Sequence, residues 1–213
     1  MKQLKVSFLP SLTAESNFAD VDGQLNGLAS QTLDNLLWSS DGYKPHVVFT
    51  IGHGGDCIYL RYTVFENDIS AYSSENNSPV FKDTCVEFFI AIGNDSRYYN
   101  IELNRLGTCL MAYSAGKHDI KLLPVGVVGK IRSQSKILGA GMGFRHGWQL
   151  TVVIPVEVFI HHPGIGFNNL SCRGNFYKCG DELNQPHFLS WSNIDLVQPN
   201  FHKFDFFGRL LFC

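Results

Sequence analysis

Two neighbouring runs of the sequence place carboxylate and amide side chains where they can hydrogen-bond a polar ligand. Both runs, residues 85–92 and 98–104, alternate apolar residues with other types. Successive side chains of a β-strand point to opposite faces, so each run predicts one apolar and one partly polar face. The Gly-Asn-Asp-Ser stretch at 93–96 predicts a turn that pairs the runs as a hairpin. The polar faces would then merge into one patch, formed by Glu87, Asn100, Glu102 and Asn104.

These carboxylates could also serve catalysis. A glycosidase needs two carboxyl groups that flank the scissile bond, one of them kept protonated by apolar surroundings. Asp83, Glu87 and Glu102 are the candidates. Carboxylates on a flat strand face more often accept hydroxyl hydrogen bonds or bind a structural cation, and a fold alone does not imply an activity. We therefore expect no catalysis, and a glycoside hydrolase acting through these three residues is the alternative.

Aromatic residues complete the inventory for a sugar site. Sugars are bound by rings that stack on their apolar faces, while amides and carboxylates take their hydroxyls. Phe81 precedes the polar strand, and Trp191 lies in the polar and aromatic segment 186–193. For Trp191, burial statistics leave core packing and ligand stacking equally open. Trp38 and Trp148 lie beside apolar runs and are expected in the core.

Period-two alternation predicts an all-β protein. Many short strands separated by Gly, Asn and Asp turns indicate an antiparallel β-sandwich, with jelly-roll or immunoglobulin-like layers and one or two short helices. No linker divides the chain, so residues 1–213 are expected to form one domain. Further strands are expected at 46–51, 58–64, 108–113, 125–131, 148–154 and 206–212, a leucine-rich helix within 25–37, and a helical turn at 155–159. The core is expected to contain Phe49, Ile51, Leu60, Tyr62, Val86, Phe88, Ile90, Ile101, Leu103, Val152 and Ile154.

Charge and cysteine usage narrow the class of partner. The net charge is −2 with no basic cluster, which argues against nucleic acid or an anionic membrane as a partner. The six cysteines have irregular spacing and no CxxC pair, which favours reduced thiols. The first residues lack the apolar run of a secretory signal, so a cytoplasmic location is favoured, although a trimmed secreted protein would show the same pattern.

Several of these segments together resemble carbohydrate-binding module family 9, in particular its free-standing members. The likeness covers most of the chain, and its most specific parts are the D-x-x-x-E pattern from Asp83 to Glu87 and the terminal F-G-x-L from Phe207 to Leu210. The matching segments, in order, are 38–64, 79–89, 99–104 with Gly107, 175–181, 187–191 and 199–210.

The resemblance implies a non-catalytic β-sandwich that holds the end of a glucan or xylan chain, as in xylan or cellulose breakdown, between two aromatic rings. Carried over by position, the rings would be Phe81 and Trp191, and the hydroxyl partners Glu87, Asn104 and Arg105. Phe81 stands where Trp is usual. The family requires no cofactor for binding but also binds calcium structurally, and no calcium ligands can be assigned from this sequence.

A third class stays open, because related sandwiches bind haem or other proteins through the same face. Haem would need an axial ligand, for which His202 and Met111 are the candidates. The sequence does not indicate the sugar, the linkage or the oligomeric state.

Overall fold

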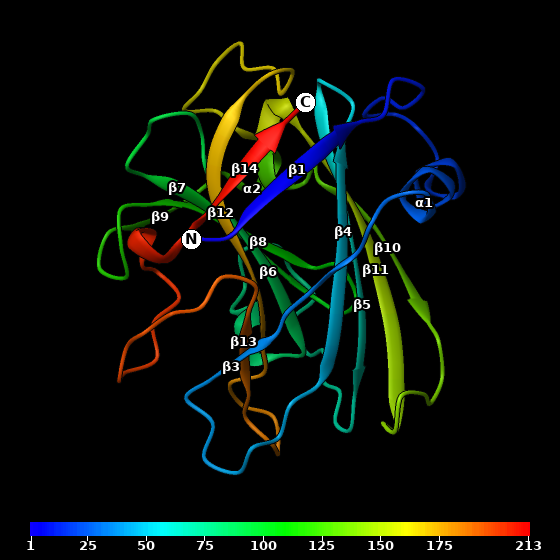
Figure 1. The fold of residues 1–213 in the computed structure, drawn as a ribbon, viewed down its shortest axis with the longest axis vertical. Helices are drawn as coiled ribbons and strands as arrows, with labels where there is room; N and C mark the ends of the chain where they lie inside the picture. Colours follow the sequence, from blue (N-terminus) through cyan, green and yellow to red (C-terminus); the bar gives the residue numbers. More distant parts are fainter.

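Alternating apolar residues fold into two β-layers that pack face to face in the computed structural model, which describes residues 1–213 (Figure 1). Within each layer neighbouring strands are antiparallel. The first layer has the order β10 (Arg132–Ile137), β11 (His146–Pro155), β5 (Cys57–Glu66) and β4 (His46–His53). The second has the order β14 (Gly208–Phe212), β12 (Ser171–Cys179), β6 (Cys85–Ala91), β7 (Tyr98–Asn104), β8 (Cys109–Ser114) and β9 (Ile120–Leu122).

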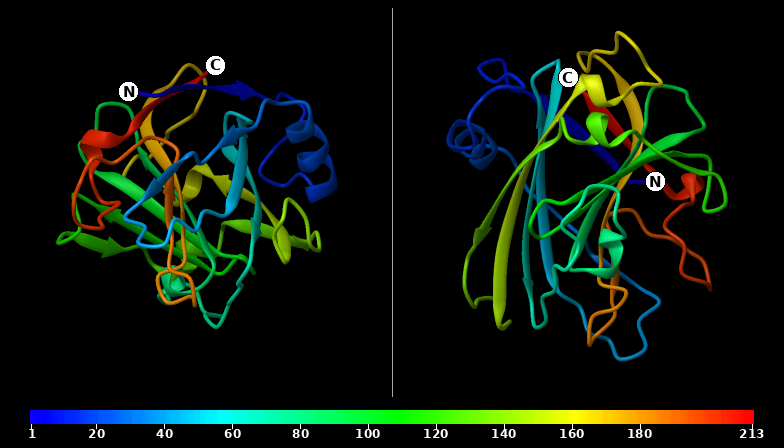
Figure 2. Two further views of the ribbon diagram at one scale, coloured as in Figure 1. Left: turned by 60° about the horizontal axis from the view of Figure 1, so that its bottom comes forward. Right: turned by 180° about the vertical axis from the view of Figure 1, so that it is seen from behind.

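Strand β1 (Gln3–Phe8) joins the two layers. Its first part pairs in parallel with β14, and its last two residues pair in parallel with β4. The right panel of Figure 2 shows the layers from behind, with β1 bridging them. The predicted β-sandwich is therefore confirmed, and its sheets are connected along one edge.

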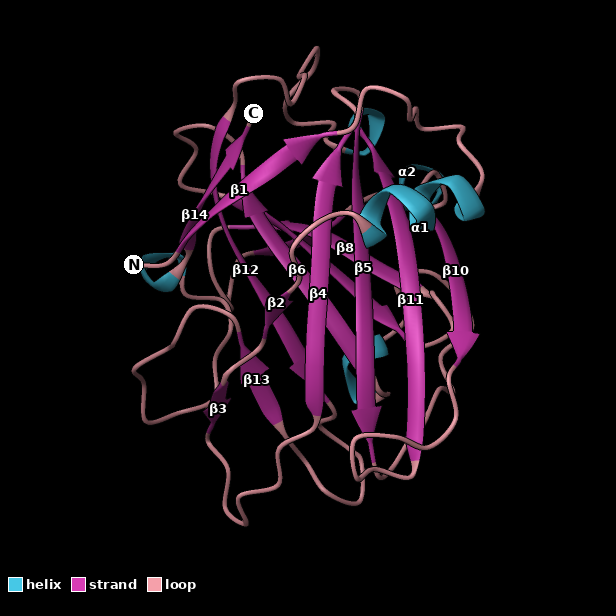
Figure 3. Ribbon diagram, turned by 45° about the vertical axis from the view of Figure 1, so that its right-hand side comes forward, coloured by secondary structure: helices cyan, strands magenta, loops and turns pink.

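Shorter elements cover the rims. β2 (Gln31–Thr32) pairs with β4, while β13 (Phe188–Ser190) pairs with both β12 and β3 (Asn35–Leu37). Helix α1 (Phe18–Asn26) lies across the outside of the first layer (Figure 3), and α2 (Val125–Val128) is a single turn. Further helical turns are Val80–Lys82, Val156–Val158 and Phe204–Phe206. Neither α-helix is long and apolar enough to cross a membrane.

The core lies between the layers and contains all eleven residues expected there. Phe176 of β12 is its centre: its ring stacks on Phe49 of the first layer at 3.8 Å and on Phe88 of β6 at 4.8 Å. Both predicted hairpins form, with Phe49 opposite Tyr62 and Glu87 opposite Glu102.

Two predictions about local structure were wrong. The helix within 25–37 instead ends at Asn26, and Leu37 lies on β3, where it packs in a separate buried cluster with Phe89 and Tyr177. The helix begins earlier because Asn17 caps it, its side chain accepting a hydrogen bond from the Asp20 amide at 3.0 Å. The segment 125–131 forms α2 instead of a strand, since Pro124 and Gly129 confine it to one turn.

Candidate functional site

The outer face of the second layer carries a cavity of about 440 Å³. Its polar floor comes from the β6–β7 hairpin, where Glu87 and Glu102 lie directly opposite each other and Asn100 lies two residues away on the same face. These are side chains that alternate with the apolar core residues of the same strands. The hairpin prediction thus located the floor correctly.

Aromatic rings from four separate segments form one side of the cavity. Phe81 comes from the helical turn before β6, Phe188 from β13, and Phe201 from the loop after Trp191. Trp38, directly after β3, completes the set. Figure 1 shows the chain around β3 and β13 and the orange to red loop beyond them gathered on the side of the second layer away from the first.

The rings support one another. The Phe201 ring stacks on Tyr177 with centroids 4.2 Å apart, and Trp38 and Phe188 pack edge to face at 5.8 Å. Trp38 has a positive φ of 49°, which is uncommon for a bulky residue, and its indole N–H donates to the Leu196 carbonyl at 2.7 Å. The surrounding structure therefore fixes this ring on the cavity wall, so the expectation that Trp38 belongs to the core was wrong. Trp148 is buried as expected.

Glu102 is buried and only half satisfied. One carboxylate oxygen accepts a hydrogen bond from the Asn100 amide at 2.9 Å, whereas the other has no partner. Asn100 is itself held by the Ser114 hydroxyl, which donates to its amide oxygen at 2.8 Å. Burial raises the pKa of Glu102 to about 7, so the carboxyl can donate as well as accept near neutral pH.

Glu87 and Asp181 extend this acidic floor. Burial, followed by the charge of Glu102, raises the pKa of Glu87 well above its usual value, and the Cys179 thiol donates to its Oε1 at 3.0 Å. Burial also raises the pKa of Asp181 to about 6. The one lysine on the cavity wall is Lys117. The cavity is therefore an aromatic and acidic pocket suited to a ligand that is rich in hydrogen-bond donors.

Trp191 lies in the core and does not reach this cavity. It is 1% exposed and packs edge to face against Phe176 at 5.8 Å. Its position follows from β12, since its backbone amide donates to the Phe176 carbonyl. Of the two alternatives left open by the sequence, core packing is therefore the correct one for Trp191. A buried ring cannot stack on a sugar.

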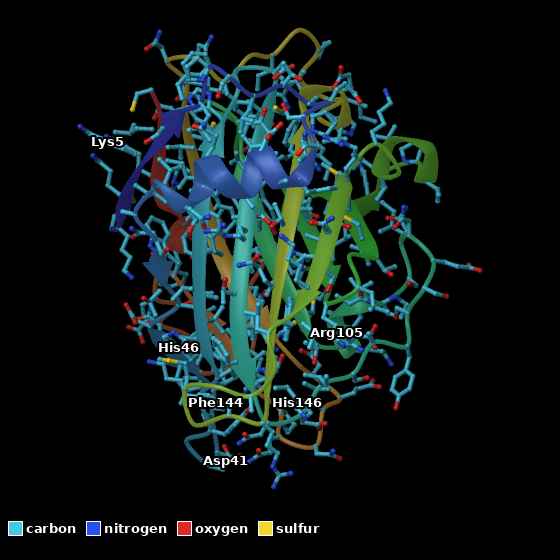
Figure 4. All side chains as sticks on the ribbon, turned by 90° about the vertical axis from the view of Figure 1, so that its right-hand side faces the viewer. Lys5, Asp41, His46, Arg105, Phe144 and His146 are labelled. Atoms are coloured by element: carbon cyan, nitrogen blue, oxygen red, sulfur yellow. The ribbon has the colours of Figure 1, made fainter.

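Asn104 and Arg105 also lie away from the cavity. Asn104 is fully buried and uses its side chain to hold a turn, donating to Asp83 at 3.0 Å and accepting from the Leu106 and Thr108 amides at 3.1 Å. Arg105 follows on that turn, which packs against β10 through Gly107 and Ser133 (Figure 4). Of the five residues that the resemblance implies, the structure brings Phe81 and Glu87 together and separates the other three from them.

Asp83 orders a loop. Its carboxylate accepts from the amides of Tyr72 and Ser73, each at 3.0 Å, and from Asn104. Although burial opposes it, these hydrogen bonds lower the pKa of Asp83. Its oxygens are thus occupied by the protein, so of the three candidate catalytic carboxyl groups only Glu87 and Glu102 can meet a ligand.

The two haem candidates are not brought together. Met111 is a core residue on β8, whereas His202 lines the cavity and hydrogen-bonds the Tyr98 hydroxyl through Nδ1 at 3.0 Å.

The calcium that the resemblance implies would need a set of oxygen donors. The structure contains one group of three or more His, Cys, Asp or Glu donors close enough to share an ion, formed by Cys85, Glu87 and Cys179. Two of its three donors are thiols, which do not suit calcium. This group does not fit that ion.

Comparisons with known proteins agree with this geometry. The model of carbohydrate-binding family 9 matches residues 20–212. A structure from Bacteroides uniformis with a provisional carbohydrate-binding assignment is 39% identical, covers 99% of both chains and superposes with a TM-score of 0.88. Comparison with curated proteins gives no significant match.

Two more distant structures share the fold. Both are family 9 modules from Caldicellulosiruptor kristjanssonii, one in complex with glucose and one with cellotriose. They are 13% and 14% identical, with TM-scores of 0.63 and 0.62. The first covers 100% of this chain and 96% of its own, and the second 99% and 93%.

Proposed function

Because this chain belongs to carbohydrate-binding family 9, we propose that its cavity binds the end of a glucan- or xylan-type chain and does not cleave it. The observation that carries the proposal is that aromatic rings and the half-satisfied carboxyl group of Glu102 line one cavity. The C. kristjanssonii modules in complex with glucose and cellotriose support a sugar ligand by analogy.

We assign the ring contacts to Phe81 and Phe201. Both are partly exposed, both line the cavity, and both pack against the buried cluster that contains Val80 and Leu110. Phe201 replaces Trp191 in this role. Asn100, Glu102 and Glu87 on the floor would take the sugar hydroxyls, because their polar atoms face the cavity from the strands beneath.

The arrangement of carboxyl groups favours binding over hydrolysis. A glycosidase places its two carboxyl groups on either side of the scissile bond. Glu87 and Glu102 instead lie side by side on one sheet face, and Asp83 is occupied by loop amides. We therefore expect no turnover of cello- or xylo-oligosaccharides.

Isothermal titration calorimetry with cellotriose and xylotriose tests the proposal. Replacing Phe81 or Phe201 by alanine removes a stacking surface worth about 1–3 kcal/mol, so affinity should fall about tenfold or more. Phe8→Ala is the matched control, since Phe8 is a partly exposed ring on β1 that does not line the cavity.

The proposal would be contradicted if the wild-type protein bound neither trisaccharide. It would also be contradicted if both alanine variants bound as tightly as the wild-type protein. Product analysis of the same mixtures tests the alternative: cleavage that disappears in Glu87→Gln would make the protein a hydrolase.

A further inference from the structure

Two thiol sulfur atoms and one carboxylate oxygen lie close together beneath the cavity floor. Cys85 and Glu87 are two residues apart on β6 and share a face, and Cys179 at the end of β12 lies directly opposite Cys85. One ligand atom from each of these residues lies within 4.8 Å of the others. All three side chains are buried, with exposed fractions of 0%, 3% and 1% in that order.

The protein gives these groups few hydrogen bonds of its own. The Cys179 thiol contacts Glu87 Oε1 at 3.0 Å and the Phe81 carbonyl at 3.7 Å, and the Cys85 thiol contacts the Val86 carbonyl at 3.7 Å. Thiols are weak donors, so Glu87 has no strong partner on this side.

The charged neighbours of Glu87 on this face are mostly acidic, with Lys117 on the cavity wall as the exception. Glu102 faces Glu87 across the hairpin with one oxygen unpartnered, and Asp181 follows Cys179 by two residues. The nearest buried lysine, Lys178, points to the opposite side of β12, where it pairs with Glu66 at 3.0 Å. A cation would therefore relieve the like-charge repulsion within this group.

We propose that Cys85, Glu87 and Cys179 bind a thiophilic divalent cation of the Zn²⁺ type. Two thiolates and one carboxylate are a zinc donor set, whereas calcium and magnesium prefer oxygen alone. Tetrahedral zinc with ordinary bond lengths holds its donors about 3.5–3.8 Å apart. The Cys179 Sγ–Glu87 Oε1 distance of 3.0 Å and the common limit of 4.8 Å are compatible with that separation after side-chain rotation.

Binding exchanges protons for the metal. The two thiols lose their protons to solvent, Glu87 binds as a carboxylate, and the hydrated ion gives up the waters that these ligands replace, while two Zn–S bonds and one Zn–O bond form without any change of oxidation state. Three protein donors leave the fourth tetrahedral position free. Of the three ligands, Glu87 is the one that lines the cavity.

This inference does not rest on sugar binding, and the two are measured separately. Cobalt(II) is the probe, added to reduced, chelator-treated full-length protein without a polyhistidine tag. We expect one equivalent to bind, with thiolate-to-cobalt charge-transfer absorption in the near ultraviolet and the visible bands of four-coordinate cobalt, and Zn²⁺ should displace it.

Single variants assign the ligands. Cys85→Ser and Cys179→Ser should abolish the charge-transfer band or reduce it by half, and weaken Zn²⁺ binding by more than about 100-fold, because loss of a direct ligand exceeds the usual effect of an outer-shell change. Glu87→Gln should keep the band and weaken affinity. Cys109→Ser is the matched control, since Cys109 is also buried, lies on β8 and belongs to the core.

If the serine variants do not fold, cobalt binding by the wild-type protein still tests the proposed metal site. Absence of a cobalt–thiolate band in folded, reduced wild-type protein would overturn the proposal, as would wild-type affinity in Cys179→Ser. A melting temperature raised by Zn²⁺ but not by Ca²⁺ would support it. Cellotriose binding without cobalt binding would leave the proposed function intact and remove only the metal site.

Discussion

Gly208 leaves the space that the Trp191 ring occupies. A Cβ atom at position 208 would lie 2.3 Å from Trp191 Cζ3, too close for any side chain. The ring also contacts Phe49 and lies beneath the Lys2 ammonium at 5.6 Å. The glycine at the start of the last strand is therefore explained by packing around a core tryptophan.

Trp191→Ala should consequently be a stability variant. Truncating a buried tryptophan costs about 3–5 kcal/mol, so the urea midpoint and melting temperature should fall markedly. Tyr72→Ala serves as the control, because Tyr72 is 91% exposed and such changes usually stay within about 0.5 kcal/mol. A nearly unchanged melt for Trp191→Ala would contradict the core assignment.

The stability of the protein should also depend on His202. Burial, with a smaller contribution from Lys117, lowers the pKa of His202 from 6.5 to about 4. Between these values the unfolded chain binds a proton at this position that the folded chain does not, so the contribution of His202 to the free energy of unfolding should decrease as the pH falls from 6.5 towards 4. The raised pKa values of Glu102 and Asp181 act in the opposite direction, so the His202 contribution is read from the difference between wild type and variant. The loss should be of the order of 1–3 kcal/mol.

Urea unfolding across this pH range checks the prediction. Relative to wild type, His202→Gln should lose less stability as the pH falls, while the exposed His118→Gln should follow wild type. Some slope should remain in His202→Gln, because burial also lowers the pKa of His187, to about 3. An identical slope in wild type and His202→Gln would show that His202 titrates normally in the folded state.

At the scale of elements, β6 and β7 explain which parts of the site could be predicted. Strict alternation places Phe88 and Ile101 in the core, and the same alternation forces Glu87 and Glu102 onto the outer face. The register of the β6–β7 hairpin and the polar floor of the cavity therefore follow from the local alternation of apolar residues.

The walls of the cavity do not follow from such a pattern. Trp38, Phe188 and Phe201 come from loops and a three-residue strand, and only long-range pairing of β3 with β13 brings them together. Aromatic residues in irregular segments carry no period that indicates a face. Trp191 was a natural candidate because its neighbours are polar, yet the backbone bond to Phe176 turns its ring inward.

A buried polar group also connects the two layers. Lys178 of β12 pairs with Glu66 of β5 at 3.0 Å and contacts His187 Nε2 at 2.7 Å. Glu66 accepts from the Trp148 indole at 2.6 Å. Both charged side chains are fully buried. An isolated lysine in a strand pattern gives no sign of such a partner, so the sequence analysis missed this group.

Lys178→Met should leave the Glu66 carboxylate buried without its partner. Breaking a buried ion pair in this way costs about 3–5 kcal/mol. Adding Glu66→Gln should restore part of the loss, with a coupling energy of about 0.5–3 kcal/mol in a double-mutant cycle measured by urea unfolding. Strictly additive effects would show that the pair does not act as a unit.

At the scale of the whole molecule, β1 holds the sandwich together along one edge. It lies outside the residues matched by the family model, yet it pairs with β14 and β4 and inserts Val6 into the core. The cavity lies on the other side of the second layer and is built from β6 to β9, from β13 and from the segments that carry Trp38, Phe81 and Phe201. Different segments of the chain therefore connect the two layers and form the cavity.

Deletion of residues 1–9 should destabilise the protein as a whole. Loss of the fully buried Val6 alone removes about 1.5–3 kcal/mol of burial energy, and the edges of β4 and β14 would lose their hydrogen-bonding partner. Thermal melts followed by circular dichroism should show a lower transition, and size-exclusion chromatography should show association through the exposed strand edges.

Lys5→Ala, on the exposed face of β1, is the control and should behave as wild type (Figure 4). Because the deletion lies away from the cavity, the trisaccharide affinity of the fraction that remains folded should be unchanged. A deletion variant that melts like wild type would show that β1 is dispensable for closing the sandwich.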